Sequence, residues 1–201
     1  SLLPLISATG STAMGRRVAP AVGGRFGRAI LELGGNNAAI VCPSANLELT
    51  LRAIAFSAMG TAGQRCTSLR RLIVHESIYD TFLAQLKRAY ASVVVGDPRE
   101  AGTLVGPLID ERAWINMQNA LEEASRFGAT VMGGTRALME MPQAYYVHPA
   151  LVEISAQADV VKRETFAPIL YVMRYSTLNE AIALQNNVAQ GLSSAIFTLN
   201  M

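Results

Sequence analysis

Cysteine and histidine are scarce in this chain, with two residues of each among 201. Two cysteines cannot build a disulfide framework, and such sparing use fits a reducing, cytoplasmic compartment. A bridge between Cys42 and Cys66 stays open at this point, because spacing along the chain does not fix distance in space. No cluster of cysteine and histidine has metal-ligand spacing, so the sequence predicts no metal site.

Long apolar runs and an excess of charge of either sign are also missing. We find no stretch long enough to cross a bilayer, and we expect no signal peptide. The net charge is +2 and 51% of the residues are hydrophobic, which is typical of a folded globular protein. We therefore expect neither a nucleic acid nor a membrane as a partner.

Apolar segments alternate with helical patterns along most of the chain. Strands are expected at residues 5–9, 30–33, 38–42, 71–75, 129–132, 145–154, 169–175 and 193–199. A turn is expected at residues 34–37, between the second and third of these strands. The alternation predicts an α/β fold with a mainly parallel open sheet flanked by helices.

Helix boundaries are marked by polar residues and by glycine. Helices are expected from Leu47, from residue 77, from 110 to 127 and from 177. Ser77 with Asp80, and Thr177 with Glu180, resemble capping boxes at two of these starts. Gly128 is placed to end the long helix.

Cys66 stands in the segment GTAGQRCTSLRR, behind small residues and among arginines. A buried structural cysteine is one interpretation. A reactive thiol is the other, because the small residues at 60–63 leave room for a ligand. The cations of Arg65, Arg70 and Arg71 would favour a thiolate if they pointed toward the sulfur. Neither His75 nor His148 forms a recognisable pair with this cysteine.

Two glutamates lie in motifs that could carry chemistry. Glu32 lies between Leu31 and Leu33 in ELGGNN, where it either faces solvent or has its pKa raised by apolar surroundings, as a general base requires. Glu164 begins the run ETFAP, which is weak evidence by itself. A glycine-bearing turn at residues 10–15, after a strand and before a helix, suits a phosphate.

Taken in order, the motifs GSTxxG, ELGG, GQRC and ETFAP closely resemble the aldehyde dehydrogenase superfamily. The resemblance covers the whole chain. The longer segments SATGST, ELGGNN and GQRCTSLRRLIVHESIYD are similar to its antiquitin branch. Members of that branch oxidise α-aminoadipic semialdehyde in lysine breakdown. The resemblance therefore implies oxidation of an aldehyde, such as this semialdehyde, to a carboxylic acid.

The same resemblance implies a role for each motif. Cys66 would attack the aldehyde, hydride would pass to NAD, and Glu32 would activate the water that hydrolyses the thioester. NADP is not excluded as the cofactor. The residues implied to contact the cofactor are Gly10, Ser11, Thr12, Gly15, Leu33, Glu164 and Phe166. Arg65 and Thr67 would contact the substrate, because a guanidinium binds a carboxylate bidentately. A structural salt bridge is the alternative for Arg65.

The resemblance also implies how the chain is organised. Residues 1–33 would be the tail of an NAD-binding domain, and residues 34–201 a catalytic domain that is incomplete at its C-terminus. The chain starts inside an expected strand, so we expect a fragment of a longer protein. The parent would be a homo-oligomer, either a dimer or a tetramer, acting on a small-molecule aldehyde.

Two alternative functions are compatible with some of these motifs. A cysteine-dependent hydrolase or acyltransferase would use Cys66 without any role for Glu164 or the glycine turn. A non-catalytic module would retain the fold alone. Reduction of NAD in the presence of an aldehyde separates the dehydrogenase from both alternatives.

We expect the purified 201-residue chain to reduce no NAD, because the implied adenosine-binding part of the cofactor domain lies outside it. The measurement is absorbance of reduced nicotinamide after addition of NAD and an acidic semialdehyde. Robust turnover by this chain alone would contradict the expectation.

Overall fold

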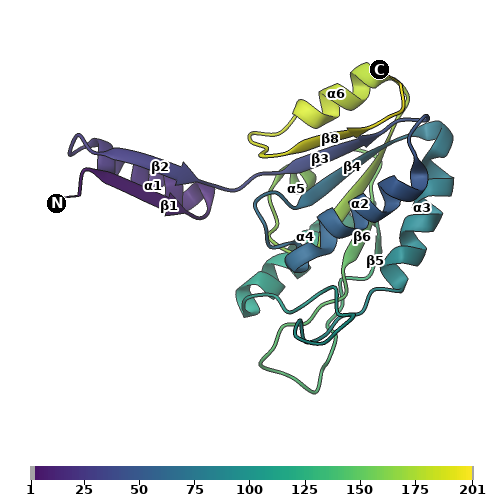
Figure 1. The fold of residues 1–201 in the computed structure, drawn as a ribbon, viewed down its shortest axis with the longest axis horizontal. Helices are drawn as coiled ribbons and strands as arrows, with labels where there is room; N and C mark the ends of the chain where they lie inside the picture. Colours follow the sequence, from purple (N-terminus) through teal and green to yellow (C-terminus); the bar gives the residue numbers. More distant parts are fainter. Residues whose placement is uncertain (1–2, 201) are drawn as a thin grey trace.

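The computed structural model describes residues 3–200, which form two β-sheets joined by an extended segment (Figure 1). A small N-terminal unit projects from a larger body. Strands and helices alternate in the order β1 (Leu5–Thr9), α1 (Thr12–Gly23), β2 (Arg28–Glu32), β3 (Asn37–Val41), α2 (Leu47–Met59), β4 (Leu69–His75), α3 (Glu76–Ala91), α4 (Glu111–Arg126), β5 (Thr130–Met132), β6 (Ala150–Glu153), α5 (Asp159–Lys162), β7 (Ile169–Tyr175), α6 (Leu178–Asn186) and β8 (Ser194–Phe197).

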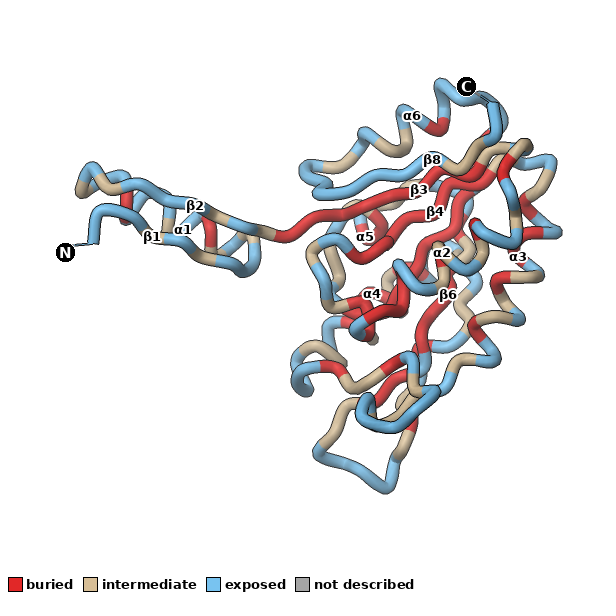
Figure 2. The backbone as a smooth tube through the Cα atoms, in the orientation of Figure 1, coloured by how far each residue is buried: buried red, intermediate tan, exposed pale blue. Residues whose placement is uncertain are grey.

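The N-terminal unit is one β-α-β crossover. Strands β1 and β2 pair in parallel from Leu5 opposite Arg28 to Thr9 opposite Glu32. Ser11 caps α1, because its side chain accepts a hydrogen bond from the Met14 N–H at 3.1 Å. Both strands are largely exposed, and their carboxyl ends point toward the larger body (Figures 1 and 2).

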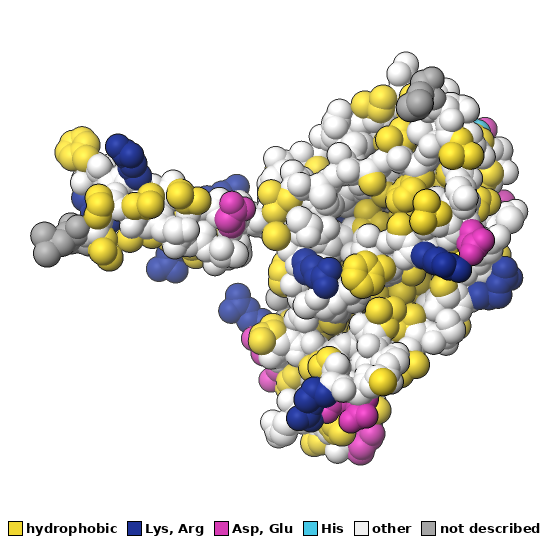
Figure 3. Space-filling view, viewed as in Figure 1, with side chains coloured by type: hydrophobic (Ala, Val, Ile, Leu, Met, Phe, Trp, Pro, Cys, Tyr) yellow, Lys and Arg dark blue, Asp and Glu magenta, His cyan; other side chains and the backbone are white. Residues whose placement is uncertain are grey.

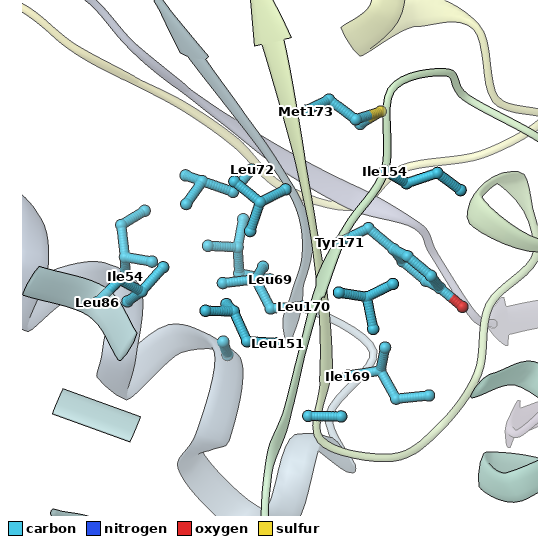
Figure 4. Packing of buried hydrophobic residues seen from close by; sticks show 14 of the residues in the cluster. Ile54, Leu69, Leu72, Leu86, Leu151, Ile154, Ile169, Leu170, Tyr171 and Met173 are labelled. Carbon is cyan, nitrogen blue, oxygen red and sulfur yellow. The ribbon is translucent and has the colours of Figure 1, made fainter. Parts of the chain in front are cut away.

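The larger body is built on a six-stranded sheet in the order β5-β6-β7-β4-β3-β8. Every neighbouring pair is parallel except β5 with β6. Helices α2 and α3 lie on one face, and α5 and α6 lie on the other (Figures 1 and 4). The predicted mainly parallel open sheet with flanking helices is therefore confirmed.

The central strands are buried on both faces, which explains their continuous apolar runs. Along β7, Leu170 packs toward α2 and α3, while Tyr171 and Met173 point to the opposite face (Figure 4). Leu72 on β4 is fully buried and lies opposite Val172 of β7. Each such side chain contributes about 1.5–3 kcal/mol by leaving water, so this sheet gives the body a firm core.

Predicted boundaries of two helices, α4 and α6, are confirmed. Asp110 caps α4 by accepting a hydrogen bond from the Ala113 N–H at 2.8 Å, and Gly128 follows the helix with φ +78°. Thr177 caps α6 by accepting from the Glu180 N–H at 3.3 Å. Polar residues at these positions satisfy N–H groups that have no partner inside the helix.

The capping box predicted at Ser77 and Asp80 is wrong. Helix α3 begins at Glu76, and the cap is His75, whose Nδ1 accepts from the Ser77 N–H at 3.2 Å. Asp80 instead pairs with Arg174 at 2.5 Å. The strand runs directly into the helix, so the cap is the last strand residue, two residues before the Ser77 that the sequence pattern indicates.

Two further local predictions need correction. The turn expected at residues 34–37 is absent, because β2 and β3 belong to different sheets: residues 33–36 form the extended link between them, and Asn37 begins β3. Residues 145–154 do not form one strand. Only Ala150–Glu153 is a strand, while Tyr145 and Val147 make isolated bridges with Leu108 and Arg136.

Candidate active site

A cavity of about 970 Å³ lies where the N-terminal unit meets the larger body. This volume is at the upper end of the range for small-molecule and cofactor pockets. Figure 3 shows the recess between the two parts of the molecule. Five stretches of chain line the cavity, namely Thr9–Ser11, Glu32–Gly34, Gln64–Thr67, one face of α4, and Arg163–Phe166.

Cys66 lies in the loop between α2 and β4 and is a free, partly exposed thiol on the cavity wall. Before it, Thr61, Ala62 and Gly63 are all left-handed, with φ of 55°, 51° and 66°. A left-handed conformation costs a non-glycine residue about 1–2 kcal/mol. Strain of this kind gathers at functional sites, where surrounding contacts hold it in place. The left-handed turn aims the loop into the cavity.

The amide of Asn37 holds the peptide that carries the thiol. Its Nδ2 donates to the carbonyls of Cys66 and Ser68, each at 2.8 Å. Its Oδ1 accepts from the N–H groups of Leu192 and Ser193, at 2.8 and 2.9 Å. Asn37 is buried, so these bonds are made away from water, where an unpaired group would be costly. The loop and the 190–193 segment are thereby tied to β3.

Glu164 reaches over the double glycine that follows β2. Its Oε1 accepts hydrogen bonds from the Gly35 N–H and from Nη2 of Arg70, both at 3.3 Å. A Cβ atom on Gly34 would lie 1.8 Å from Glu164 Oε2, so the Glu164 carboxylate could not keep this position beside any larger residue. The predicted close approach at this glycine pair is therefore present, and the other partner is Glu164. Phe166 extends the same wall and is 45% exposed.

Glu32 and Gly10 mark the carboxyl ends of β2 and β1. The Gly10 N–H donates to the Glu32 carbonyl at 3.0 Å, which continues the strand pairing to the cavity edge. The Glu32 side chain is exposed and lines the cavity. Of the two interpretations of this residue, burial among apolar neighbours is wrong within this chain, because β2 is exposed along most of its length.

Not every residue implied to contact a cofactor reaches the cavity. Gly10, Ser11 and Leu33 line it, whereas Thr12 and Gly15 do not. Thr12 Oγ1 accepts a hydrogen bond from Gln190 Nε2 at 3.2 Å. Gly15 lies under Leu33, where an added Cβ would meet Leu33 Cδ1 at 2.5 Å. These two positions shape the wall from behind.

The arginines around the cysteine point in different directions. Arg65 lines the cavity with Thr67, and its Nε donates to Thr61 Oγ1 at 2.8 Å. Arg71 does not face the cavity. Its Nη2 donates to the Asn36 carbonyl at 2.8 Å, and burial lowers its pKa to about 10. The idea that all three arginines favour a thiolate is therefore wrong for Arg71.

Neither histidine lines the cavity. His75 Nδ1 lies 2.8 Å from Ser77 Oγ, and its ring meets Tyr175 edge-on with centroids 5.1 Å apart. His148 is exposed elsewhere on the body. The geometry therefore offers Cys66 no imidazole base, which counts against a cysteine–histidine hydrolase.

Helix α4 supplies a wall that the sequence reasoning missed. Its cavity residues are Asn116, Asn119, Ala120 and Glu123. Their spacing puts them on one helical face, so periodicity alone could have grouped them. Nothing in the sequence says that this face meets a cavity. Glu123 also pairs with Arg163, which precedes Glu164 and anchors that segment to the helix.

Residues 2–201 match the model of the aldehyde dehydrogenase family. The chain belongs to this family. Its relatives include aldehyde dehydrogenase family 7 member A1 from Pisum sativum, which is 50% identical over 98% of this chain and 38% of its own length. Alpha-aminoadipic semialdehyde dehydrogenase from Bos taurus is 48% identical over 98% of this chain and 36% of its own length.

A solved structure with a bound dinucleotide has the same fold. The structure of PnpE in complex with nicotinamide adenine dinucleotide superposes with a TM-score of 0.94 and 35% identity. The superposition covers 98% of this chain and 41% of that one. This chain thus spans less than half the length of the relatives that it matches.

Within residues 3–200, no group of three or more histidine, cysteine, aspartate or glutamate side chains could hold a metal ion. No helix in that range is long and apolar enough to cross a membrane. The cavity is the place where the candidate residues of this aldehyde dehydrogenase chain meet.

We expect Gly63→Ala to lower the free energy of unfolding by about 3 kcal/mol or more, through left-handed strain plus overpacking. An alanine Cβ would lie 2.4 Å from the Ala167 carbonyl oxygen. Gly102→Ala is the matched control, since Gly102 has φ +88° and no atom within 4 Å. It should cost only about 1–2 kcal/mol. If urea denaturation gave both variants the same loss in free energy of unfolding, the contact with Ala167 would not contribute to stability.

Proposed function

We propose that this chain is the thiol-bearing part of an NAD-dependent aldehyde dehydrogenase that oxidises a semialdehyde to a carboxylic acid. One observation carries the proposal: Cys66, Glu32 and Glu164, from three separate stretches of chain, line a single cavity. A nucleophile and two carboxylates around one space are the groups that such a reaction needs. Membership of the aldehyde dehydrogenase family supports the same conclusion.

Cys66 performs the first step. Its thiolate attacks the aldehyde carbon, a C–S bond forms, and the carbonyl oxygen becomes an oxyanion of the resulting thiohemiacetal. The Cys66 N–H makes no hydrogen bond elsewhere within residues 3–200, so it is free to donate to that oxygen. A donor already aimed at developing charge stabilises the transition state without rearrangement.

The cofactor, when bound, supplies the acceptor for the hydride that leaves the thiohemiacetal carbon. The residues of the cavity fit a dinucleotide. Gly10 and Ser11 lie at the N-terminus of α1, where free N–H groups favour phosphate, and the first turn holds no acidic residue. Glu164 keeps Oε2 free to accept from ribose hydroxyls. Leu33 and Phe166 give apolar contact, while Thr12 and Gly15 shape the turn from behind.

Glu32 performs the last step. Loss of the hydride leaves a thioester on Cys66, which water must hydrolyse. Glu32 takes a proton from that water, hydroxide oxygen bonds to the acyl carbon, and the C–S bond breaks. The products are the carboxylic acid and the free thiol. An exposed carboxylate at the cavity edge can exchange its proton with solvent between turnovers.

The proposed substrate is an aldehyde with an acidic far end, such as α-aminoadipic semialdehyde. Arg65 supports this choice, because it is a cation on the cavity wall beside the nucleophile. A guanidinium pairs well with a carboxylate, and Thr67 adds a polar contact. The Bos taurus relative is named for the same semialdehyde.

We further propose that residues 1–33 complete an NAD-binding domain and residues 34–201 form most of the catalytic domain. The separate two-stranded sheet of β1 and β2 supports this boundary. NAD is the proposed cofactor, and NADP is the alternative. The parent protein is a homo-oligomer, a dimer or tetramer. Two free cysteines support a reducing, cytoplasmic compartment.

In the full-length parent, Cys66→Ala should abolish aldehyde-dependent formation of reduced nicotinamide. Glu32→Gln should still give a single-turnover burst but lose about 10²–10⁴-fold in steady-state rate, because only hydrolysis needs the base. Rapid-mixing absorbance measures both. A Glu32→Gln enzyme with neither burst nor turnover would contradict the assigned step. Ester hydrolysis without any nicotinamide reduction would favour a hydrolase.

Arg65→Ala in the same parent should reduce kcat/KM for an acidic semialdehyde by about 10–100-fold, as expected for loss of a charged hydrogen bond. A neutral aliphatic aldehyde of similar length should lose less than about threefold. Arg112→Ala, at an exposed position outside the cavity, is the matched control. Equal losses on both aldehydes would show that Arg65 is structural.

A further inference from the structure

Arg70 is a buried cation that the proposed chemistry does not use. It lies at the start of β4, directly behind the cysteine loop, with only 2% of its surface exposed. Burying a guanidinium is costly unless all of its N–H groups are paired. A buried guanidinium in a central strand of the sheet calls for a physical reason.

Every nitrogen of the Arg70 side chain donates to a partner. A guanidinium has five N–H groups in a fixed planar fork, and five acceptors surround it. They are the carbonyls of Gly35 at 3.4 Å, Gly63 at 3.2 Å, Arg65 at 3.0 Å and Thr165 at 2.7 Å, with Glu164 Oε1 at 3.3 Å. Four of the five acceptors are backbone oxygens, so the guanidinium binds the main chain of these segments and fixes its position.

These acceptors come from three stretches that are far apart in the sequence. Gly63 and Arg65 flank the turn into Cys66, Gly35 belongs to the link after Glu32, and Thr165 follows Glu164. The guanidinium carbon also lies 5.4 Å from the centre of the Phe166 ring. One planar group therefore touches each of the segments that line the cavity near the thiol.

The neighbouring arginine makes a different set of contacts. Arg71 is fully buried too, but its guanidinium donates to the carbonyls of Asn36, Leu184 and Gln185 and to the side chain of Gln157. Leu184 and Gln185 belong to α6 and Asn36 to the link after β2, and none of the four acceptor residues lines the cavity. Arg71 thus matches Arg70 in residue type, strand and burial, and differs in what it holds.

Electrostatics agrees with a fixed, charged Arg70. Burial lowers its pKa, and the Glu164 carboxylate opposes that effect through its charge and hydrogen bond. The ion pair is well shielded, with side-chain exposures of 3% and 17%. Breaking one side of a shielded pair leaves the other charge uncompensated, so the two groups depend on each other.

We propose that Arg70 is the positioning residue that locks the cysteine loop, the glycine link after Glu32 and the Glu164–Phe166 segment into one geometry. A lysine at this place would keep the charge but lose the fork, because an ammonium is a single point of donation. The positioning itself is independent of the reaction; only its effect on turnover rests on the function proposed above.

Amide hydrogen exchange on the 201-residue chain tests the lock without any activity. In Arg70→Lys, exchange should rise by about tenfold or more in residues 61–68 and 164–167 together, because both lose bonds to the same fork. In Arg71→Lys it should stay unchanged there. A rise in only one of the two segments, or an equal rise in the Arg71 variant, would overturn the proposal.

Kinetics of the full-length parent give the second readout. Arg70→Lys should raise KM for the cofactor and lower kcat, each by about tenfold, since Glu164 and Cys66 are both displaced. Arg71→Lys should lower Tm while leaving the cofactor KM within about twofold. An unchanged cofactor KM in Arg70→Lys would overturn the proposal.

The positioning role of Arg70 and the proposed dehydrogenase function can be tested separately. If Arg70→Lys is insoluble, Arg70→Gln takes its place in both experiments, with the same expected results. A parent that reduces no nicotinamide with any aldehyde would defeat the proposed function. The exchange result would still decide whether Arg70 locks the segments.

Discussion

The four hydrogen bonds of the buried Asn37 amide are the contact on which the site most depends. They pin the Cys66 carbonyl to β3 and, through Leu192 and Ser193, tie a distant loop to the same strand. The position of a nucleophile in a loop depends on how firmly the loop backbone is held, so a functional loop needs a rigid scaffold beneath it. The buried central strands provide that scaffold.

Tight backbone approach is the second constraint on the cavity. Gly34 lets Glu164 cross the link after β2, and Gly63 lets the cysteine loop pack on Ala167. The left-handed Thr61 and Ala62 show that this packing outweighs local strain. A cavity walled by backbone in this way keeps its shape, which suits a reaction that needs a thiol, a base and a bound cofactor in fixed relation.

Local patterns predicted much of this molecule and failed where neighbours decide. The caps at Asp110 and Thr177 are short-range features, so the sequence shows them. The cap at His75 escaped prediction, because it depends on a strand that runs without a break into a helix. Similarly, the sequence left open whether Glu32, between Leu31 and Leu33, faces solvent or apolar neighbours, and the structure shows that side chain exposed at the end of β2.

The order of residue types along the chain was enough to establish the α/β class, the aldehyde dehydrogenase resemblance and the candidates Cys66, Glu32 and Glu164. Motifs record which groups the chemistry uses, since those groups must be particular residues. Folding in three dimensions settled which arginine faces the cavity, which face of α4 closes it and what holds the cysteine loop. Such contacts join segments that are far apart in the sequence, and a local sequence pattern does not show which distant residue each side chain will contact.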